Sequence, residues 1–257
     1  MNEGCQSDCR NNPIDRLADQ ILWAAREMFQ RGLVVGAWGN ISLRLATRCG
    51  DGRFLQNGLA AASSPGALAS NSQSDIDHDN LILITPSGMD YNQLQKTDLV
   101  AINLEGQIIR GHRRPSTEMA LHLAIYRQRP EIRAIVHTHS VFASALAVAR
   151  IPLPPILEEL AQLLGQEVPV SEYALAGTEG LAENAVRALG QGPAVLLTNH
   201  GLVGVGKTVR EALMICQVVE KGAQVYIFSR ILGSPRVLSS GEVRQLREEY
   251  LYHYGQK

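Results

Sequence analysis

The most informative part of the sequence is the stretch Ile132-Arg133-Ala134-Ile135-Val136-His137-Thr138-His139-Ser140. It starts as an apolar run typical of a buried strand and ends in two histidines separated by one residue. In an extended chain the side chains at i and i+2 point the same way, about 7 Å apart. His137 and His139 would therefore share one face, close enough to bind one metal ion. This spacing favours a metal site over two unrelated core histidines.

A third histidine follows a second apolar run. The residues Ala-Val-Leu-Leu-Thr-Asn at 194–199 precede His200, and Gly201 follows it. Three histidine ligands with a fourth position left open are typical of a catalytic zinc site rather than a closed structural one. His200 alone would be read equally well as the beginning of a turn. Together with the first stretch, it is predicted to be the third ligand.

The composition excludes several classes of protein. The 257 residues are 45% hydrophobic, which is enough for a full core without disulfides. Lys plus Arg is 24 and Asp plus Glu is 25, and no basic stripe indicates nucleic acid. No apolar run reaches the roughly 18 residues of a membrane span. The polar first residues lack a signal-peptide core, so we expect a cytoplasmic protein. The four cysteines match no zinc-finger or redox spacing.

The chain is predicted to form one domain over residues 14–257, preceded by a disordered tail at 1–13. Residues 46–80 are rich in Gly, Ala, Ser, Asn and Asp and show little periodicity. Such a composition is typical of a long surface insertion. Within it, His78 stands among aspartates, and we interpret this segment as a solvated acidic loop rather than a metal site.

Hydrophobic periodicity predicts alternating helices and strands. Helices are expected at 14–31, 115–128, 140–149, 156–164, 181–189, 208–232 and 242–254. The glycine-rich segment 36–44 is expected to be a turn that opens into a short strand. Further strands are expected at 81–84, 99–104, 107–109, 132–137, 167–173, 195–198 and 202–205. Hairpins mixed with helices favour an α/β sandwich whose sheet is mainly antiparallel.

Three segments have the chemistry of an anion site. The glycine-rich turns at 36–44 and 85–88 could present backbone N–H groups to an anion, although each could also be an ordinary turn. Ser116 and Thr117 lie at a predicted helix start, where free N–H groups and the helix dipole attract anions. Glu118 follows them. It is either common helix punctuation or a general base beside the anion site.

The order of these motifs resembles the class II aldolase/adducin family. The motifs are Gly-Asn-Ile-Ser at 39–42, Thr-Pro-Ser-Gly at 85–88, Ser-Thr-Glu at 116–118, His-Thr-His at 137–139 and Asn-His-Gly at 199–201. Each is weak alone, but five in this order are specific. The resemblance covers roughly residues 14–232. The resemblance implies a three-layer α/β/α fold and a homotetramer with sites at subunit interfaces.

The resemblance also implies a function and a set of residues. The implied enzyme is a zinc-dependent lyase, an aldolase that cleaves a phosphorylated ketose such as fuculose 1-phosphate through a metal-stabilised enediolate. His137, His139 and His200 would bind Zn²⁺ or another divalent cation, and Glu118 would be the acid/base residue. The substrate phosphate would lie among Gly39, Asn40, Ser87, Gly88, Ser116 and Thr117. The chemistry is consistent, because a cation stabilises the developing enediolate and a carboxylate can transfer the proton.

Other reactions stay open on the same scaffold. The aldolases use a tyrosine from a neighbouring subunit after the histidine pair, whereas this chain has Glu158 and Glu159 there and no tyrosine before Tyr173. A glutamate at that place favours a methylthioribulose-1-phosphate dehydratase as the alternative. Sugar-phosphate 4-epimerases usually have aspartate where this chain has Glu118. A non-catalytic adducin-like interaction domain and an unrelated metallohydrolase are further alternatives.

Overall fold

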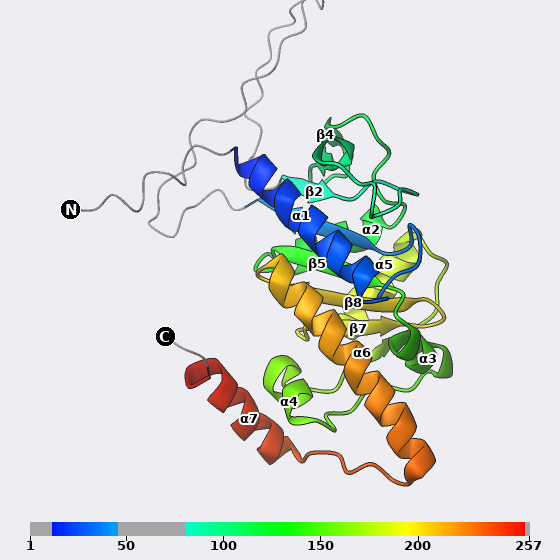
Figure 1. Cartoon of the computed structure of the whole chain (residues 1–257), viewed down its shortest axis with the longest axis vertical. Helices are drawn as coiled ribbons and strands as arrows, with labels where there is room; N and C mark the ends of the chain where they lie inside the picture. Colours follow the sequence, from blue (N-terminus) through cyan, green and yellow to red (C-terminus); the bar gives the residue numbers. More distant parts are fainter. Residues whose placement is uncertain (1–11, 46–80, 255–257) are drawn as a thin grey trace, which may run out of the picture.

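The computed structural model describes residues 12–45 and 81–254, and these residues build one eight-stranded sheet with helices on both faces (Figure 1). Residues 1–11 of the predicted tail, the predicted insertion at 46–80 and His78 within it lie outside the described residues. The domain division proposed from the sequence therefore stays a prediction. None of the helices in the described part is long and apolar enough to cross a membrane.

The strands run in the order β4-β3-β2-β1-β5-β8-β7-β6. They are β1 (Asn40–Arg44), β2 (Ile82–Ile84), β3 (Val100–Ile102), β4 (Ile108–Arg110), β5 (Ala134–Thr138), β6 (Val170–Ser171), β7 (Ala194–Leu197) and β8 (Gly201–Gly206). All neighbours are antiparallel except β6 and β7. The prediction of an α/β fold with a mainly antiparallel sheet is confirmed, but the sheet is mixed. The exception follows from the chain path, because α5 (Glu179–Leu189) connects β6 to β7 and allows a parallel crossover.

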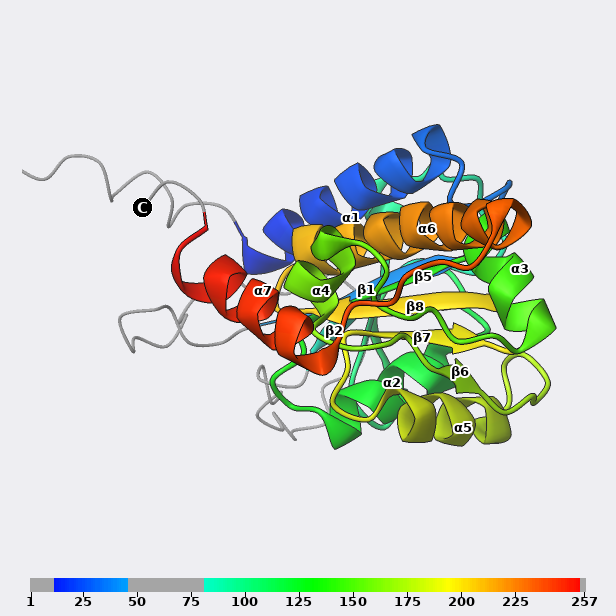
Figure 2. The same ribbon diagram turned by 90° about the horizontal axis from the view of Figure 1, so that it is seen from below.

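Two helical layers enclose this sheet (Figure 2). One layer contains α1 (Pro13–Gln30), α3 (Val141–Ala149), α4 (Glu158–Leu164) and α6 (Val209–Leu232), and α7 (Ser240–Tyr252) packs on α4. The other contains α2 (Met119–Gln128) and α5. The short helix η2 (Lys96–Asp98) precedes β3. The expected three-layer arrangement is thus present in the described residues.

Strand β5 shows why the sheet has two cores. Ala134 and Val136 belong to the core under α1 and α6, whereas Ile135 belongs to the core under α2 and α5. Successive strand residues point to opposite faces, so a strand covered on both sides is apolar throughout. By the same alternation, His137 lies on the face of Ile135, toward the layer of α2.

Strand β1 brings polar side chains to that same face. Ile41 and Leu43 pack in the core under α1 and α6, so the alternating Asn40 and Ser42 point toward α2. Asn40 is almost fully buried and Ser42 is fully buried. Buried polar groups require hydrogen-bond partners. Their partners lie on α2 and at its N-terminal end.

The beginning of α2 differs from the prediction. The helix was expected from Pro115, but it begins at Met119, and Glu118 occupies the N-cap position. The cause is pairing with the preceding loop. Pro115 forms a β-bridge with Pro86, and the Ser116 amide donates to the Thr85 carbonyl at 3.0 Å. Residues 115–116 are therefore extended, and Glu118 is held at the junction between this bridge and the helix.

Candidate active site

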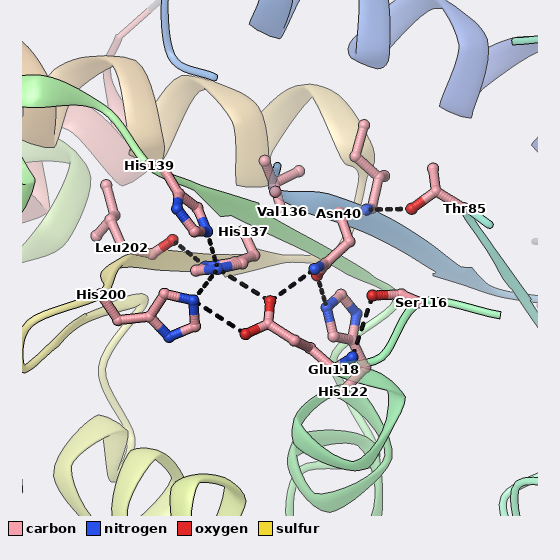
Figure 3. A network of polar contacts seen from close by, with 12 residues as sticks. Asn40, Thr85, Ser116, Glu118, His122, Val136, His137, His139, His200 and Leu202 are labelled. Atoms are coloured by element: carbon pink, nitrogen blue, oxygen red, sulfur yellow. Dashed lines mark hydrogen bonds and ion pairs between the residues drawn. The ribbon is translucent and has the colours of Figure 1, made fainter. Parts of the chain in front are cut away.

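His137 is held in one orientation by the neighbouring strand. Its Nδ1 lies 3.0 Å from the backbone oxygen of Leu202 on β8 (Figure 3). A carbonyl oxygen can only accept a hydrogen bond, so Nδ1 donates. In the neutral ring, Nε2 then has a free lone pair, as a metal ligand requires.

The three predicted metal ligands converge at their Nε2 atoms (Figure 3). His137 Nε2 lies 2.9 Å from His139 Nε2 and 3.3 Å from His200 Nε2. Burial, together with the neighbouring His137 and His200 imidazoles, lowers the pKa of His139 to about 3, so its ring is neutral. Nitrogen lone pairs that face one another repel unless a cation lies between them. The donor set therefore fits a divalent metal.

His200 reaches this cluster from a tight turn between β7 and β8. Asn199 has a left-handed backbone with φ of 57°, and the His200 amide donates to the Leu197 carbonyl at 3.0 Å. Gly201 follows, and a Cβ atom there would lie 2.2 Å from the backbone oxygen of Thr138. Only glycine permits this close approach of the turn to β5. His200 is thus part of a turn and part of the cluster, and the two interpretations of the sequence do not exclude each other.

The Glu118 carboxylate is a fourth polar group beside the three imidazoles. Its Oε2 lies 3.1 Å from His137 Nε2, and its Oε1 lies 3.0 Å from His200 Nε2. The ligand atoms of the four residues all lie within 4.8 Å of one another. Burial favours the neutral carboxyl, but the contacts with the His137 and His200 imidazoles outweigh it and hold the pKa of Glu118 well below its usual range. Glu118 is therefore ionised and lies beside the three imidazoles.

The cluster lies at a cavity of about 380 Å³. Nine of the ten residues proposed from the sequence line this cavity: Gly39, Asn40, Ser87, Gly88, Ser116, Thr117, Glu118, His139 and His200. The tenth, His137, is fully buried behind them. The lining also includes Trp38 and Ala176, which the sequence did not single out, because nothing in their local pattern separates them from ordinary loop residues.

Gly39 allows the first of the two predicted anion turns to reach the cluster. Its φ is 87°, and a Cβ atom there would lie 2.7 Å from the backbone oxygen of His137. The buried hydroxyl of Tyr91 donates to the Gly39 carbonyl and helps to hold the turn. The backbone of residues 39–40 is thus packed directly against the end of β5, next to the histidines.

Two of the predicted phosphate ligands also contact Glu118. Asn40 Nδ2 donates to Glu118 Oε2 at 2.8 Å, and the Ser116 hydroxyl accepts from the Glu118 amide at 3.2 Å. Asn40 was expected to face the substrate only. Its side-chain amide is instead engaged by the carboxylate that we expect to perform catalysis.

Sequence reasoning missed three residues behind Glu118. His122, Ser42 and Tyr126 are fully buried and join Asn40 and Glu118 in a continuous line of hydrogen bonds, which we call the His122 network. Spacing could have revealed it. Glu118, His122 and Tyr126 stand at i, i+4 and i+8, a single face of a helix. Asn40 and Ser42 stand at i and i+2, a single face of a strand.

The fold is an α/β protein with a mixed sheet between two helical layers. At the floor of its cavity, three histidines and a glutamate form a cluster that could hold a metal ion. Residues 19–227 match the family model described as the class II aldolase and adducin N-terminal domain. The chain belongs to this family. The family resemblance inferred from the motifs is confirmed, and so is the prediction of an enzyme of the class II aldolase type.

Known relatives cover most of the chain. A 5-deoxy-D-ribulose 1-phosphate aldolase from Bacillus thuringiensis serovar kurstaki is 36% identical over 69% of this chain and 82% of its own. A 5-methylthioribulose-1-phosphate/5-deoxyribulose-1-phosphate aldolase from Rhodospirillum rubrum is 31% identical over 90% of this chain and 89% of its own. Among solved structures, an L-fuculose 1-phosphate aldolase superimposes with a TM-score of 0.77 at 29% identity, covering 92% of this chain and 97% of the other.

Proposed function

We propose that this protein is an aldolase that uses a divalent metal, zinc in the first instance, to cleave a ketose 1-phosphate. The observation that carries the proposal is the convergence of three imidazole Nε2 atoms and the Glu118 carboxylate within 4.8 Å, next to the cavity. Such a donor set suits a cation that also binds substrate oxygens. His137, His139 and His200 would hold the ion.

The substrate class follows from the names of the relatives and from the cavity. The relatives are named for 5-deoxyribulose 1-phosphate and L-fuculose 1-phosphate, and both compounds are ketose 1-phosphates. In the described chain, the residues that line the cavity include no lysine or arginine. The phosphate would therefore be bound by neutral donors at the turns of Gly39 and Gly88 and by the hydroxyls of Ser87, Ser116 and Thr117.

The reaction would break the bond between C3 and C4 of the ketose. The C4 hydroxyl would give its proton to the ionised Glu118 carboxylate as C4 becomes an aldehyde. The electron pair of the broken bond would form the enediolate of a three-carbon phosphate. A divalent cation, when bound, supplies the positive charge that stabilises this enediolate. Glu118 would return a proton to C3 and so release dihydroxyacetone phosphate. The turns that hold the phosphate would fix C3 next to the Glu118 carboxylate.

The dehydratase alternative depends on Glu158 and Glu159. Both lie on α4, and neither lines the cavity of its own chain. Glu159 forms an ion pair with Lys221 at 2.6 Å, whereas Glu158 is exposed. Either carboxylate would have to act in the cavity of a neighbouring subunit. A homotetramer, which the family resemblance implies, would provide such neighbours and is part of the proposal.

The remaining alternatives are less well supported. The 4-epimerases usually have an aspartate at this position, whereas this chain has Glu118, which argues against an epimerase. A non-catalytic domain has no need of the four converging ligand atoms. We therefore keep the aldolase as the main proposal and the dehydratase as the second.

The test is to incubate the metal-loaded protein with 5-deoxyribulose 1-phosphate, fuculose 1-phosphate and other ketose 1-phosphates, and to identify products by mass spectrometry. An aldolase releases dihydroxyacetone phosphate and an aldehyde. A dehydratase yields an intact carbon skeleton that has lost one water. Full turnover after chelation of the metal would overturn both proposals.

A further inference from the structure

The His122 network runs from Glu118 into the protein interior, and Figure 3 shows its first part, from Glu118 through Asn40 to His122. Asn40 Nδ2 donates to Glu118 Oε2 at 2.8 Å, and Asn40 Oδ1 is hydrogen-bonded to His122 Nε2. On the other side of the ring, His122 Nδ1 lies 2.6 Å from Ser42 Oγ. The Tyr126 hydroxyl ends the network, 2.9 Å from Ser42 Oγ and 3.0 Å from the Ser42 carbonyl.

Only one direction of donation suits this arrangement. An ionised carboxylate can only accept, so the NH₂ group of Asn40 must face Glu118 and its carbonyl must face His122. His122 Nε2 must then carry the ring proton. Nδ1 has none in the neutral ring and accepts from the Ser42 hydroxyl. The tautomer of His122 and the orientation of the Asn40 amide are therefore linked.

The apolar core alone does not require these polar groups. The five side chains of the network are between 0% and 6% exposed, and the same face of the sheet is otherwise filled by residues such as Ile84, Ile135 and Val203. A buried polar network costs free energy unless all its members are paired, and when paired it fixes one geometry. The network ends at the carboxylate next to the three histidines, so the geometry that it fixes is that of Glu118.

We propose that His122 is a positioning residue for Glu118. It holds the Asn40 amide in the orientation that donates to Glu118 Oε2, and Ser42 and Tyr126 select the tautomer that makes this possible. Glu118 Oε1 takes no part in this network. It faces His200 Nε2 at 3.0 Å and is left for the substrate or the metal. This inference rests on the proposed acid/base role of Glu118.

Two substitutions at His122 separate positioning from packing. In His122→Gln, the amide nitrogen can take the place of Nε2 and still donate to Asn40. In His122→Asn, the shorter side chain reaches only the place of Nδ1, so the contact with Ser42 stays and the donor to Asn40 is lost. Both variants remove one hydrogen bond from the same buried site. They should have similar melting temperatures and equal metal content.

Positioning predicts that the two variants differ in kcat. His122→Asn should lose about 10-fold in kcat, the effect of one misdirected hydrogen bond, while His122→Gln stays within about 3-fold of the wild type. In a Glu118→Gln background, His122→Asn should cause no further loss, because the group that it positions is already inactive. Equal kcat losses in the two variants, or a full additional loss in the Glu118→Gln background, would reject the proposal.

A measurement on the unmodified protein is independent of these variants. ¹⁵N NMR of the histidine rings should show His122 protonated at Nε2 and unprotonated at Nδ1 at neutral pH. The opposite tautomer would overturn the inference even if both variants failed to fold. The proposed function is tested by a separate result. If Glu118→Gln retains wild-type kcat, the acid/base role is wrong, whereas an inactive Glu118→Gln with indistinguishable His122 variants rejects the positioning role alone.

Discussion

Asn40 on β1 and His137 on β5 are direct partners in the antiparallel sheet, and both side chains point toward the layer of α2. Glu118, at the beginning of α2, contacts both of them, through Oε2 at 2.8 Å from Asn40 Nδ2 and 3.1 Å from His137 Nε2. One strand pair and one helix start thus place a neutral donor, a metal ligand and a carboxylate around a single point. The site depends on sheet register, since a slip of one residue would turn Asn40 and His137 to opposite faces.

Removal of His200 should abolish stable metal binding. His200→Ala removes one of three converging imidazoles, and an ion held by two imidazoles is bound much more weakly. The exposed His253→Ala is a suitable control, because His253 lies on the surface at the end of α7. Metal content after dialysis, measured by mass spectrometry of the digested protein, should be near one per chain for the control and near zero for His200→Ala. An unchanged content in His200→Ala would remove this residue from the site.

Loss of the Ser87 hydroxyl should weaken substrate binding without affecting the chemical step. Ser87 is exposed at the cavity and next to Gly88. Hydrogen bonds to charged groups contribute about 1.5–3 kcal/mol, so Ser87→Ala should raise KM for a ketose 1-phosphate by about 10-fold or more. The value of kcat should stay near that of the wild type.

Two comparisons check this interpretation of Ser87. Ser234→Ala, a change at an exposed serine after α6, should leave KM unchanged. The unphosphorylated ketose should react poorly with all three proteins. If it reacts with the wild type as well as the phosphorylated sugar does, the loops at Gly39 and Gly88 do not form a phosphate site.

Much of the architecture could be predicted because the strands and helices differ in period. The apolar runs at 132–137 and 194–198 identified β5 and β7, and the long helical period at 208–232 identified α6 almost to the residue. The beginning of α2 was wrong, because a bridge between Pro86 and Pro115 depends on a contact across the sheet. Local sequence contains no information about such a pairing.

The site was predictable to different degrees. The histidine pair was visible because its two members are neighbours on one strand, and His200 was visible because it ends a similar strand. Their convergence within 3.3 Å of His137 depends on the pairing of β5 with β8, which only the structure provides. His122 was overlooked for a different reason. In an otherwise apolar helix it resembled a core histidine, and its partner Asn40 lies 82 residues away in sequence.

Glu118→Gln should remove catalysis while the metal and the fold are retained. The substitution preserves shape but removes the carboxylate that transfers the proton, and general acid–base catalysis typically contributes about 10²-fold or more. We expect kcat to fall by at least that factor, with metal content unchanged. Near wild-type turnover would contradict proton transfer by Glu118 in an aldolase and in a dehydratase.

The two glutamates on α4 distinguish the two reactions. Glu159 is paired with Lys221, so Glu159→Gln serves as the structural control for the exposed Glu158. In an aldolase of the proposed kind, both changes should be mild and a three-carbon phosphate should still form. In a dehydratase, Glu158→Gln should be inactive while Glu159→Gln retains activity. Product analysis and kcat for the two variants decide between the reactions.

The His122 network should also make folding sensitive to acid. Burial, together with the nearby His137 imidazole, lowers the pKa of His122 from 6.5 to about 3. Between these pH values the unfolded chain binds a proton at His122 and the folded chain does not. Protons then favour unfolding, so the stabilisation is complete above pH 6.5 and is lost as the pH falls toward 3.

The size of this effect can be measured by difference. His122 alone should reduce the free energy of unfolding by about 1.4 kcal/mol for each pH unit below 6.5. Urea unfolding between pH 7.5 and 4.5 should therefore show a steeper loss of stability for the wild type than for His122→Gln, which has no titrating group at this position. The exposed His253→Gln should keep the slope of the wild type. Parallel curves for the wild type and His122→Gln would show that His122 titrates normally, and the neutral ring on which the network depends would then be wrong.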